Sequence, residues 1–428
     1  MATSILAGCQ TSADTKIPPK PSDLGVLPSA LLTAQSLHSR DDVRRAFRQI
    51  EADRARNNRE MIELNEIPAP PFGEAQRAAR LAAMFRELSL DVSLDDVGNV
   101  IARRPGWTGA ETVVLGAHID TVFPIETDVT VRRDGDLFIA PGIGDNTRGL
   151  IALLSLARAM DAGGIETEDD VIFAGLIGEE GLGDLKGVKH LYRDGADHPD
   201  SFIAIDGGRL DGLVHGAVGS NRYRITYQGP GGHSWGHFGR ANPHHALARA
   251  IETFAQTALP VTETGPKSSF SVGRIGGGTS INSIAYESWM EVDMRSGNIG
   301  KLGELDAVFR AAVQQGLAVE NETRTRGPEL NVEIDQVGER PAGLLPLDMP
   351  IVQNAMAAMR VMGVEPEPGI SSTDSNIPIS MGLPAVTIAR GGRSSGAHSL
   401  DETWEDVDAH LGVQQALLLT LMEAGIAN

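Results

Sequence analysis

Histidine and carboxylate residues stand at the ends of predicted strands in this chain, and metal binding is the chemistry that such residues support. The apolar run at residues 112–115 predicts a buried strand, which leads into His118 with Asp120 two residues later. A histidine near an aspartate is common by chance, so this pair alone indicates little. Its interest comes from further acidic and histidine residues in similar settings. They are Asp145, Glu179, Glu180, Asp206 and His398.

Imidazole nitrogen and carboxylate oxygen are ligands that zinc takes in catalytic sites, where a position stays open for water. The candidates exceed what one ion needs, so they fit two metals that share a bridging carboxylate. Such metals polarise a carbonyl group and lower the pKa of a bound water, and a carboxylate not spent on metal can take up the proton. Asp120 is suited to holding His118 in the ligating tautomer. Taken singly, each of these residues also has an ordinary structural explanation, such as a turn or a helix cap.

The elements that must position these residues follow an alternating pattern. Residues 140–213 alternate between strand and helix, as a parallel sheet requires. Predicted strands at 170–176 and 201–205 end just before Glu179 and Asp206, as the strand at 112–115 ends before His118. Ligand sites in open α/β sheets lie at the carboxyl ends of the strands. We therefore expect an α/β domain with a mostly parallel central sheet and the candidates at one edge.

A second pattern interrupts this one near residue 214. Polar and apolar residues alternate at 222–228, 284–294 and 330–337, which predicts antiparallel strands, with a helix at about 243–257 between them. The first pattern resumes with a helix at about 350–362, a strand at 385–388 and a last helix at about 407–424. We predict a catalytic domain of residues 39–213 and 340–428, an inserted α+β domain of residues 214–339, and a disordered tether at 1–38.

Composition narrows the class of protein. The chain has 428 residues, which favours two domains, and no apolar run long enough to span a bilayer. A formal net charge of −20 argues against nucleic acid as a partner, because phosphate binding needs a basic face. The same charge suits a protein that gathers carboxylates around cations.

The single cysteine, Cys9, excludes an internal disulfide and a thiolate-rich metal site. The sequence around it, Leu6-Ala7-Gly8-Cys9, matches the lipobox of bacterial lipoproteins, although Met1–Gly8 lacks a positive region and is short for a signal peptide. Two interpretations stay open. Either Cys9 carries a lipid, the start lies further upstream and the protein sits in the cell envelope, or the match is accidental and the protein is cytoplasmic.

The motifs around the candidates resemble those of the co-catalytic zinc exopeptidases, the family of aminoacylase, carboxypeptidase G, succinyl-diaminopimelate desuccinylase and peptidase T. The resemblance runs from about residue 41 to the C-terminus, and the peptidase T-like and carboxypeptidase G-like branches are the most similar. Any one motif is weak, but all of them in family order are specific. They are His118-x-Asp120, Gly144-Asp145-Asn146, Gly178-Glu179-Glu180-Gly181, Asp206-Gly207-Gly208 and Gly396-Ala397-His398-Ser399.

The resemblance implies a role for each residue. Two zinc ions per chain, or cobalt or manganese in their place, would be bound by His118 and Asp206 on one side and by Glu180 and His398 on the other, with Asp145 bridging. Glu179 would be the general base, and Asp120 would orient His118. The resemblance also implies a cis peptide between Asp145 and Asn146.

The inserted domain resembles the lid and dimerisation domain of the same family. On that resemblance, His233 in Gly231-Gly232-His233-Ser234 would reach across a homodimer and stabilise the oxyanion of the tetrahedral intermediate. Asn282 and Arg295 would meet the carbonyl or carboxylate of the substrate, for which the planar fork of an arginine is suited. Asp374 lies where relatives line the substrate site, with no role that we can assign.

We therefore expect a dinuclear zinc hydrolase that cleaves the amide bond of small peptides as an exopeptidase. Two alternatives stay open: a deacylase or amidohydrolase that acts on N-acyl amino acids at the same site, and a catalytically silent peptide-binding lipoprotein. The motifs do not separate the first alternative from the peptidase. The second is disfavoured because the general base and every ligand are present.

Overall fold

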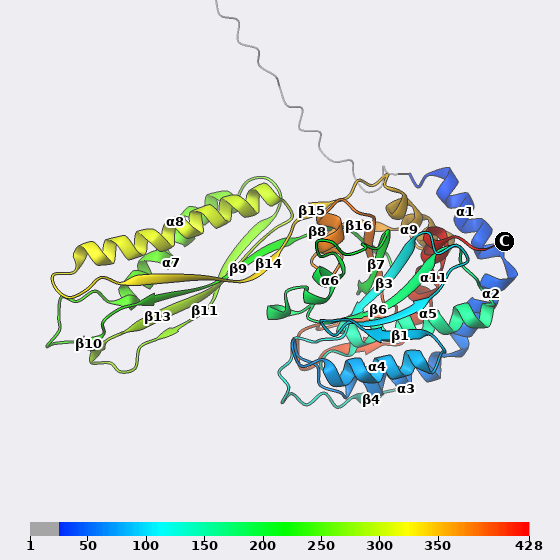
Figure 1. Ribbon diagram of the computed structural model, residues 1–428, viewed down its shortest axis with the longest axis horizontal. Helices are drawn as coiled ribbons and strands as arrows, with labels where there is room; N and C mark the ends of the chain where they lie inside the picture. The colour runs from blue at the N-terminus through cyan, green and yellow to red at the C-terminus, as the bar shows by residue number, and fades with distance from the viewer. Residues whose placement is uncertain (1–24, 428) are drawn as a thin grey trace, which may run out of the picture.

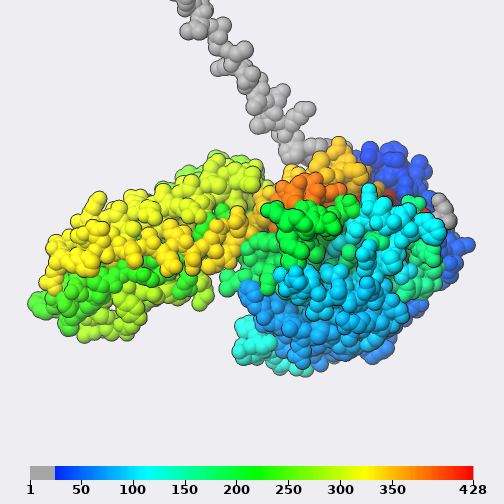
Figure 2. Space-filling view, in the orientation of Figure 1, coloured from blue at the N-terminus to red at the C-terminus, as the bar shows by residue number. Residues whose placement is uncertain are grey.

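The computed structural model describes residues 25–427 as two bodies, each with its own hydrophobic core. Figure 1 shows an elongated lid domain beside a larger α/β body, and Figure 2 shows the lid projecting from one side of that body. Cys9, and with it the predicted lipid attachment, lies outside the described residues. No described helix combines the length and the apolar character that crossing a membrane requires.

The bounds of the elements are as follows. The helices are α1 (Pro28–Ser39), α2 (Asp41–Ala52), α3 (Arg54–Asn65), α4 (Ala75–Arg86), the π-helical turn η2 (Ile143–Arg148), α5 (Gly149–Gly163), the 3-10 turn η3 (Gly181–Gly183), α6 (Lys186–Leu191), α7 (Pro243–Thr262), α8 (Ile299–Thr323), α9 (Pro350–Val361), α10 (Asn376–Ser380) and α11 (Ala409–Ala424). The strands of the large body are β1 (Asp91–Leu94), β2 (Val100–Arg104), β3 (Thr112–His118), β4 (Arg132–Asp134), β5 (Leu137–Ile139), β6 (Asp170–Leu176), β7 (Ser201–Gly207), β8 (Gly212–Ala217), β15 (Gly343–Leu344), β16 (Glu367–Ser371), β17 (Ala385–Ala389), β18 (Arg393–Ser395) and β19 (Thr403–Glu405). Those of the lid are β9 (Gly219–Gln228), β10 (Gly232–His233), β11 (Ser268–Gly277), β12 (Ser283–Ile284), β13 (Glu287–Ser296) and β14 (Asn331–Arg340).

The large body is built on a nine-stranded mixed sheet with the order β1-β2-β6-β3-β7-β17-β8-β15 and with β16 beside β8. Its centre is parallel: β3 pairs with β6 and with β7, and β7 pairs with β17. These strands are almost wholly buried, which explains their continuous apolar runs, and α5 packs against β3, β6 and β7. The predicted α/β fold class with an inserted smaller domain is confirmed.

The lid is an antiparallel sheet in the order β11-β13-β9-β14 with α7 and α8 packed along it (Figure 1). Alternate residues of β9 and β13 are buried, as the polar and apolar alternation predicted. Neither α8 nor β11 was predicted from the sequence. The signal for α8 was present, since Asn298 caps the helix by accepting from the main-chain N–H of Lys301, and Leu302, Leu305 and Phe309 follow at helical spacing.

The prediction of a disordered tether at residues 1–38 is wrong for its second part. Pro28–Ser39 forms helix α1, with Ala30, Ala34 and Leu37 buried where it packs against α9 and α11. Pro28 was interpreted as part of a linker, but it stands in the first turn of the helix, where a proline costs no hydrogen bond. Small alanines make this face apolar without a conspicuous pattern.

The chain crosses between the bodies twice. It enters the lid at Val218–Gly219, where β9 begins, and returns at Arg340–Pro341, where β14 ends. The predicted boundaries at residues 214 and 340 stay predictions. The two crossings lie side by side because β14 pairs with β9 from Ser220 outward.

Candidate metal centre

Three neighbouring strand ends deliver the first candidates. His118 is the last residue of β3, Asp206 lies near the end of β7, and Glu179 and Glu180 follow β6. Because β3 lies between β6 and β7 in the sheet, these ends lie side by side. Nε2 of His118 is 3.7 Å from Oδ1 of Asp206, and the imidazole is buried. The sheet therefore positions one histidine–carboxylate pair.

Asp145 reaches the same place from a different element. It lies in η2, the turn that leads into α5, and the expected cis peptide between Asp145 and Asn146 is present. Gly142 begins this turn with φ 75°, and a side chain there would collide with Thr121. Oδ1 of Asp145 is 3.2 Å from Nε2 of His118.

A second histidine–carboxylate pair forms on the other side of Asp145. Nε2 of His398, which follows β18, is 2.9 Å from Oε1 of Glu180 and 3.4 Å from Oδ2 of Asp145. The His398 side chain is 53% exposed, so this half of the site opens to solvent. The structure thus brings together all five residues predicted as metal ligands.

These donor atoms suit metal ions. Ligands about 2.1 Å from a tetrahedral ion lie about 3.4 Å from each other, which is the range of the spacings around Asp145. Ligand atoms of His118, Asp145 and Glu180 all lie within 4.8 Å of one another. Each oxygen of Asp145 faces a different histidine, as a bridging carboxylate requires. The residues therefore fit a metal centre.

The electrostatics of the cluster also favour bound cations. Burial raises the pKa of Asp206, and repulsion from the negative charge of Asp145 raises it further. A cation between the two carboxylates would relieve this repulsion. Burial also favours the neutral form of Asp145, but Arg390, His118 and His398 outweigh it and hold the pKa of Asp145 well below its usual range. Hydrogen bonds with Asp145 and Glu180 raise the pKa of His398 to about 10. The cluster stabilises positive charge.

Asp120 contacts His118 differently from the prediction. The nearest partner of Nδ1 of His118 is the main-chain oxygen of Asp120, at 2.9 Å, whereas its carboxylate oxygen Oδ1 is 3.6 Å away. The carboxylate instead accepts hydrogen bonds from the main-chain N–H groups of Glu179 and Glu180, at 3.0 and 2.8 Å. Asp120 therefore orients the imidazole and also fixes the turn that carries both glutamates.

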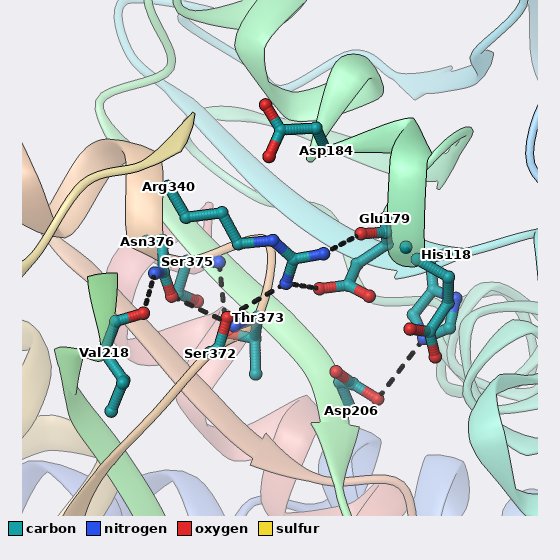
Figure 3. A network of polar contacts seen from close by, with 12 residues as sticks. His118, Glu179, Asp184, Asp206, Val218, Arg340, Ser372, Thr373, Ser375 and Asn376 are labelled. Carbon is teal, nitrogen blue, oxygen red and sulfur yellow. Dashed lines mark hydrogen bonds and ion pairs between the residues drawn. The ribbon is translucent and has the colours of Figure 1, made fainter. Parts of the chain in front are cut away.

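Glu179 is buried and points into the site from the lid side. Its Oε1 accepts from Nη1 of Arg340 at 2.8 Å, while the rest of the carboxylate lies toward Asp206 and His118 (Figure 3). Burial raises the pKa of Glu179 well above its usual range, and Arg340 opposes that shift. A buried carboxyl with a raised pKa is typical of an acid–base residue.

The lid residues do not join this cluster within one chain. His233 lies in β10 and Asn282 just before β12, and the pairing of these strands places both at the end of the lid farthest from the large body (Figure 1). Both side chains are exposed. Arg295 lies closer to the junction, where it lines a cavity of about 400 Å³ with Lys267 and Ser372, and its Nε donates to Asp293 at 2.7 Å.

Arg390 and Glu402 support the centre and were not predicted from the sequence. Arg390 follows β17 and donates from Nη1 to Oδ1 of Asp145 and of Asp206, at 3.1 and 3.0 Å. Its position directly after a buried strand is the signal that could have indicated it. Glu402 is fully buried and accepts from the main-chain N–H groups of Gly142, Gly144 and Asp145, at 2.8–3.0 Å. It stands four residues after His398, the only hint that the sequence offers.

Comparisons with known proteins agree with this site. A sequence model of the peptidase family M20/M25/M40 matches residues 114–424. The uncharacterized protein YqjE of Bacillus subtilis is 24% identical over 349 residues, which cover 78% of this chain and 89% of that protein. A putative succinyl-diaminopimelate desuccinylase of Mycobacterium tuberculosis is 24% identical over 344 residues, covering 79% of this chain and 90% of that protein. The crystal structure of a tripeptidase from Staphylococcus aureus shares the fold with a TM-score of 0.67 at 21% identity, covering 85% and 97% of the two chains.

Proposed function

This chain belongs to the peptidase family M20/M25/M40 and is a metal-dependent hydrolase of peptide or amide bonds, and we propose that it is an exopeptidase for small peptides with a dinuclear zinc centre. The observation that carries the proposal is the position of Asp145 between two histidine–carboxylate pairs. A carboxylate that faces a histidine with each of its oxygens suits a site with two metal ions better than a site with one.

In the proposed reaction the protein residues hold the centre and move one proton. When bound, the metal supplies Lewis-acid polarisation of the scissile carbonyl and acidifies the attacking water. His118 and Asp206 would hold one ion, Glu180 and His398 would hold the other, and Asp145 would contact both. Glu179 takes a proton from water and delivers it to the leaving nitrogen. Its burial raises its affinity for that proton, which suits the transfer.

We assign the oxyanion contact to His233 of a second copy of the chain. His233 stands far from the cluster of its own chain, so a contact with the substrate requires a dimer. The lid end around it carries exposed apolar side chains, with Trp235 88%, Phe238 83% and Ile281 104% exposed. Apolar side chains gathered at one place favour association. Asn282 and Arg295 are proposed to contact the substrate carbonyl or carboxylate.

Small peptides are the proposed substrates because the shared fold includes a tripeptidase. A deacylase that acts on N-acyl amino acids is the second candidate, favoured by the likeness to a putative desuccinylase over most of both chains. Hydrolysis of a panel of dipeptides, tripeptides and N-acyl amino acids separates the two.

The test of the mechanism is Glu179→Ala. It should abolish turnover while metal content stays close to that of the wild type, because Glu179 acts on the proton and not on the metal. Glu367→Ala, which changes a surface ion pair with Arg209, is the matched control and should keep full activity. Normal turnover by Glu179→Ala would refute the assignment.

A further inference from the structure

A buried arginine joins the lid to the proposed general base. Arg340 is the last residue of β14, the strand through which the chain leaves the lid, and it is 4% exposed. Its Nη1 donates to Oε1 of Glu179 at 2.8 Å and to Oγ of Ser372 at 2.9 Å. Its Nη2 donates to the main-chain oxygen of Glu179. The guanidinium therefore holds both the side chain and the backbone of this residue.

The contact between Arg340 and Glu179 uses one oxygen of the Glu179 carboxylate and leaves the other free to accept a proton. In Figure 3, Arg340 and His118 lie on opposite sides of Glu179, Asp206 lies below it, and the carboxylate oxygen that Arg340 does not contact points away from Arg340. Within residues 25–427, no other side chain donates a hydrogen bond to the Glu179 carboxylate. A general base must present its oxygen to the proton in a defined direction. Arg340 is placed to define that direction.

The same arginine lies at the junction where the lid meets the large body. Both crossings of the chain are tied to the segment of residues 371–376. The main-chain N–H of Val218 donates to the main-chain oxygen of Ser371 at 2.8 Å. Nδ2 of Asn376 donates to the main-chain oxygens of Val218 and Pro341, at 2.9 and 3.2 Å (Figure 3). Ser372, in the same segment, also accepts a hydrogen bond from Arg340. Because Arg340 ends β14 and also contacts Glu179, a shift of the end of β14 would move the Glu179 side chain.

We propose that Arg340 is a positioning residue for Glu179, through which the seating of the last lid strand sets the direction of the general base. This inference rests on the proposed function, because it takes Glu179 as the base. A planar guanidinium suits the task, since it binds a carboxylate and a carbonyl at once, whereas the ammonium of a lysine supplies charge without the fork.

A purely structural ion pair would have the same contacts, so the test needs a matched arginine. Arg222 of β9 donates from Nη1 to the main-chain oxygen of Gly181 at 2.7 Å and from Nε to Asp293 at 3.0 Å. It thus joins a lid strand to the same turn, two residues beyond Glu179, without a hydrogen bond to the carboxylate of the base. Arg222→Met removes a comparable link between the domains.

The experiment compares Arg340→Met, Arg340→Lys and Arg222→Met, with the panel substrate that the wild type cleaves fastest. Arg340→Met should lower kcat by about 100-fold or more, with KM and metal content close to wild type, because a misdirected base slows the proton transfer. Arg340→Lys should retain more activity, and added guanidinium ion should restore part of the rate of Arg340→Met. Arg222→Met should keep kcat close to wild type. Equal losses for Arg222→Met and Arg340→Met, or a change in KM alone, would overturn the inference.

A second readout does not depend on the substrate. In crystals grown without substrate, the Glu179 carboxylate should leave its position in Arg340→Met and keep it in Arg222→Met. An unmoved Glu179 carboxylate in Arg340→Met would overturn the inference whatever the enzyme cleaves. Failure of the proposed function would show differently, as a metal-loaded wild type that cleaves no member of the panel.

Discussion

Asp145 lies between His118 and His398, with Oδ1 3.2 Å from Nε2 of the first and Oδ2 3.4 Å from Nε2 of the second. The two histidines come from the two chain segments that form the α/β body, one at the end of β3 before the lid and the other after β18, beyond the lid. Each has its own carboxylate partner, Asp206 or Glu180. The site is thus divided into two halves that meet at one side chain.

Asp145→Asn tests this division. An amide offers one ligand oxygen and a nitrogen that does not coordinate, so the variant should bind at most one ion and lose activity at least about 100-fold. Elemental analysis of purified protein measures the ions per chain. Asp134→Asn, an exposed change in β4, is the control and should leave metal content unchanged. An Asp145→Asn variant that keeps two ions would show that this side chain does not bridge.

Complementation between two inactive variants tests the role of His233. If His233 acts on the site of a partner, a mixture of His233→Ala and Glu179→Ala should regain activity, because each hybrid dimer contains one complete site. Random exchange in a symmetric dimer predicts about a quarter of the wild-type rate. The measurement is hydrolysis by the mixed variants after subunit exchange. Activity that stays at the level of the separate variants would contradict a role of His233 in the site of a partner.

Helix α1 is expected to contribute to the stability of the large body. Ala34 is fully buried where α1 packs against α9 and α11, so Ala34→Asp would bury an unpaired carboxylate and lower the free energy of unfolding by about 2–4 kcal/mol. Urea denaturation measures the change. Gln35→Asp, at the next position and exposed, should change the free energy of unfolding little. Equal stabilities of the two variants would mean that α1 does not dock.

The free energy of unfolding should depend on pH through the protonation of His215. Burial lowers the pKa of His215 below its ordinary value of 6.5, although its Nδ1 contact with the main-chain oxygen of Leu345 at 2.8 Å opposes the shift. The unfolded chain therefore binds the proton more readily, and this contribution to stability is present above pH 6.5 and is lost as the pH falls below it. His215→Asn keeps a donor for Leu345 but does not titrate. The stability gap between wild type and His215→Asn should narrow from about pH 8 to about pH 5, and a constant gap would contradict the assignment.

The parts of this molecule that the sequence predicts well are those governed by local pattern. The buried strands ending at His118 and Asp206 were predicted from continuous apolar runs, and their parallel pairing follows from the helices between them. Helix α1 was missed because alanines give its buried face little apolar signal. The helix α8 was overlooked although its cap and spacing were readable.

The parts that escape prediction depend on contacts between distant residues. Glu179 and Arg340 are separated by 161 residues, and nothing near either residue indicates the other. The carboxylate of Asp120 was expected against His118, yet it accepts from the N–H groups of the turn at 179–180, a geometry that only the assembled strand ends create. Likewise, the single chain separates His233 from the cluster, so its predicted role needs a second copy.

The measurement that tests the central claim most directly is metal content by elemental analysis beside hydrolysis of the substrate panel, before and after chelation. We predict about two zinc ions per chain and cleavage that is lost on chelation and restored by zinc, cobalt or manganese. The members of the panel that are cleaved would assign the enzyme as a peptidase or a deacylase. Protein without bound metal that cleaves nothing after any of these ions is added would contradict the account and favour a silent binding protein.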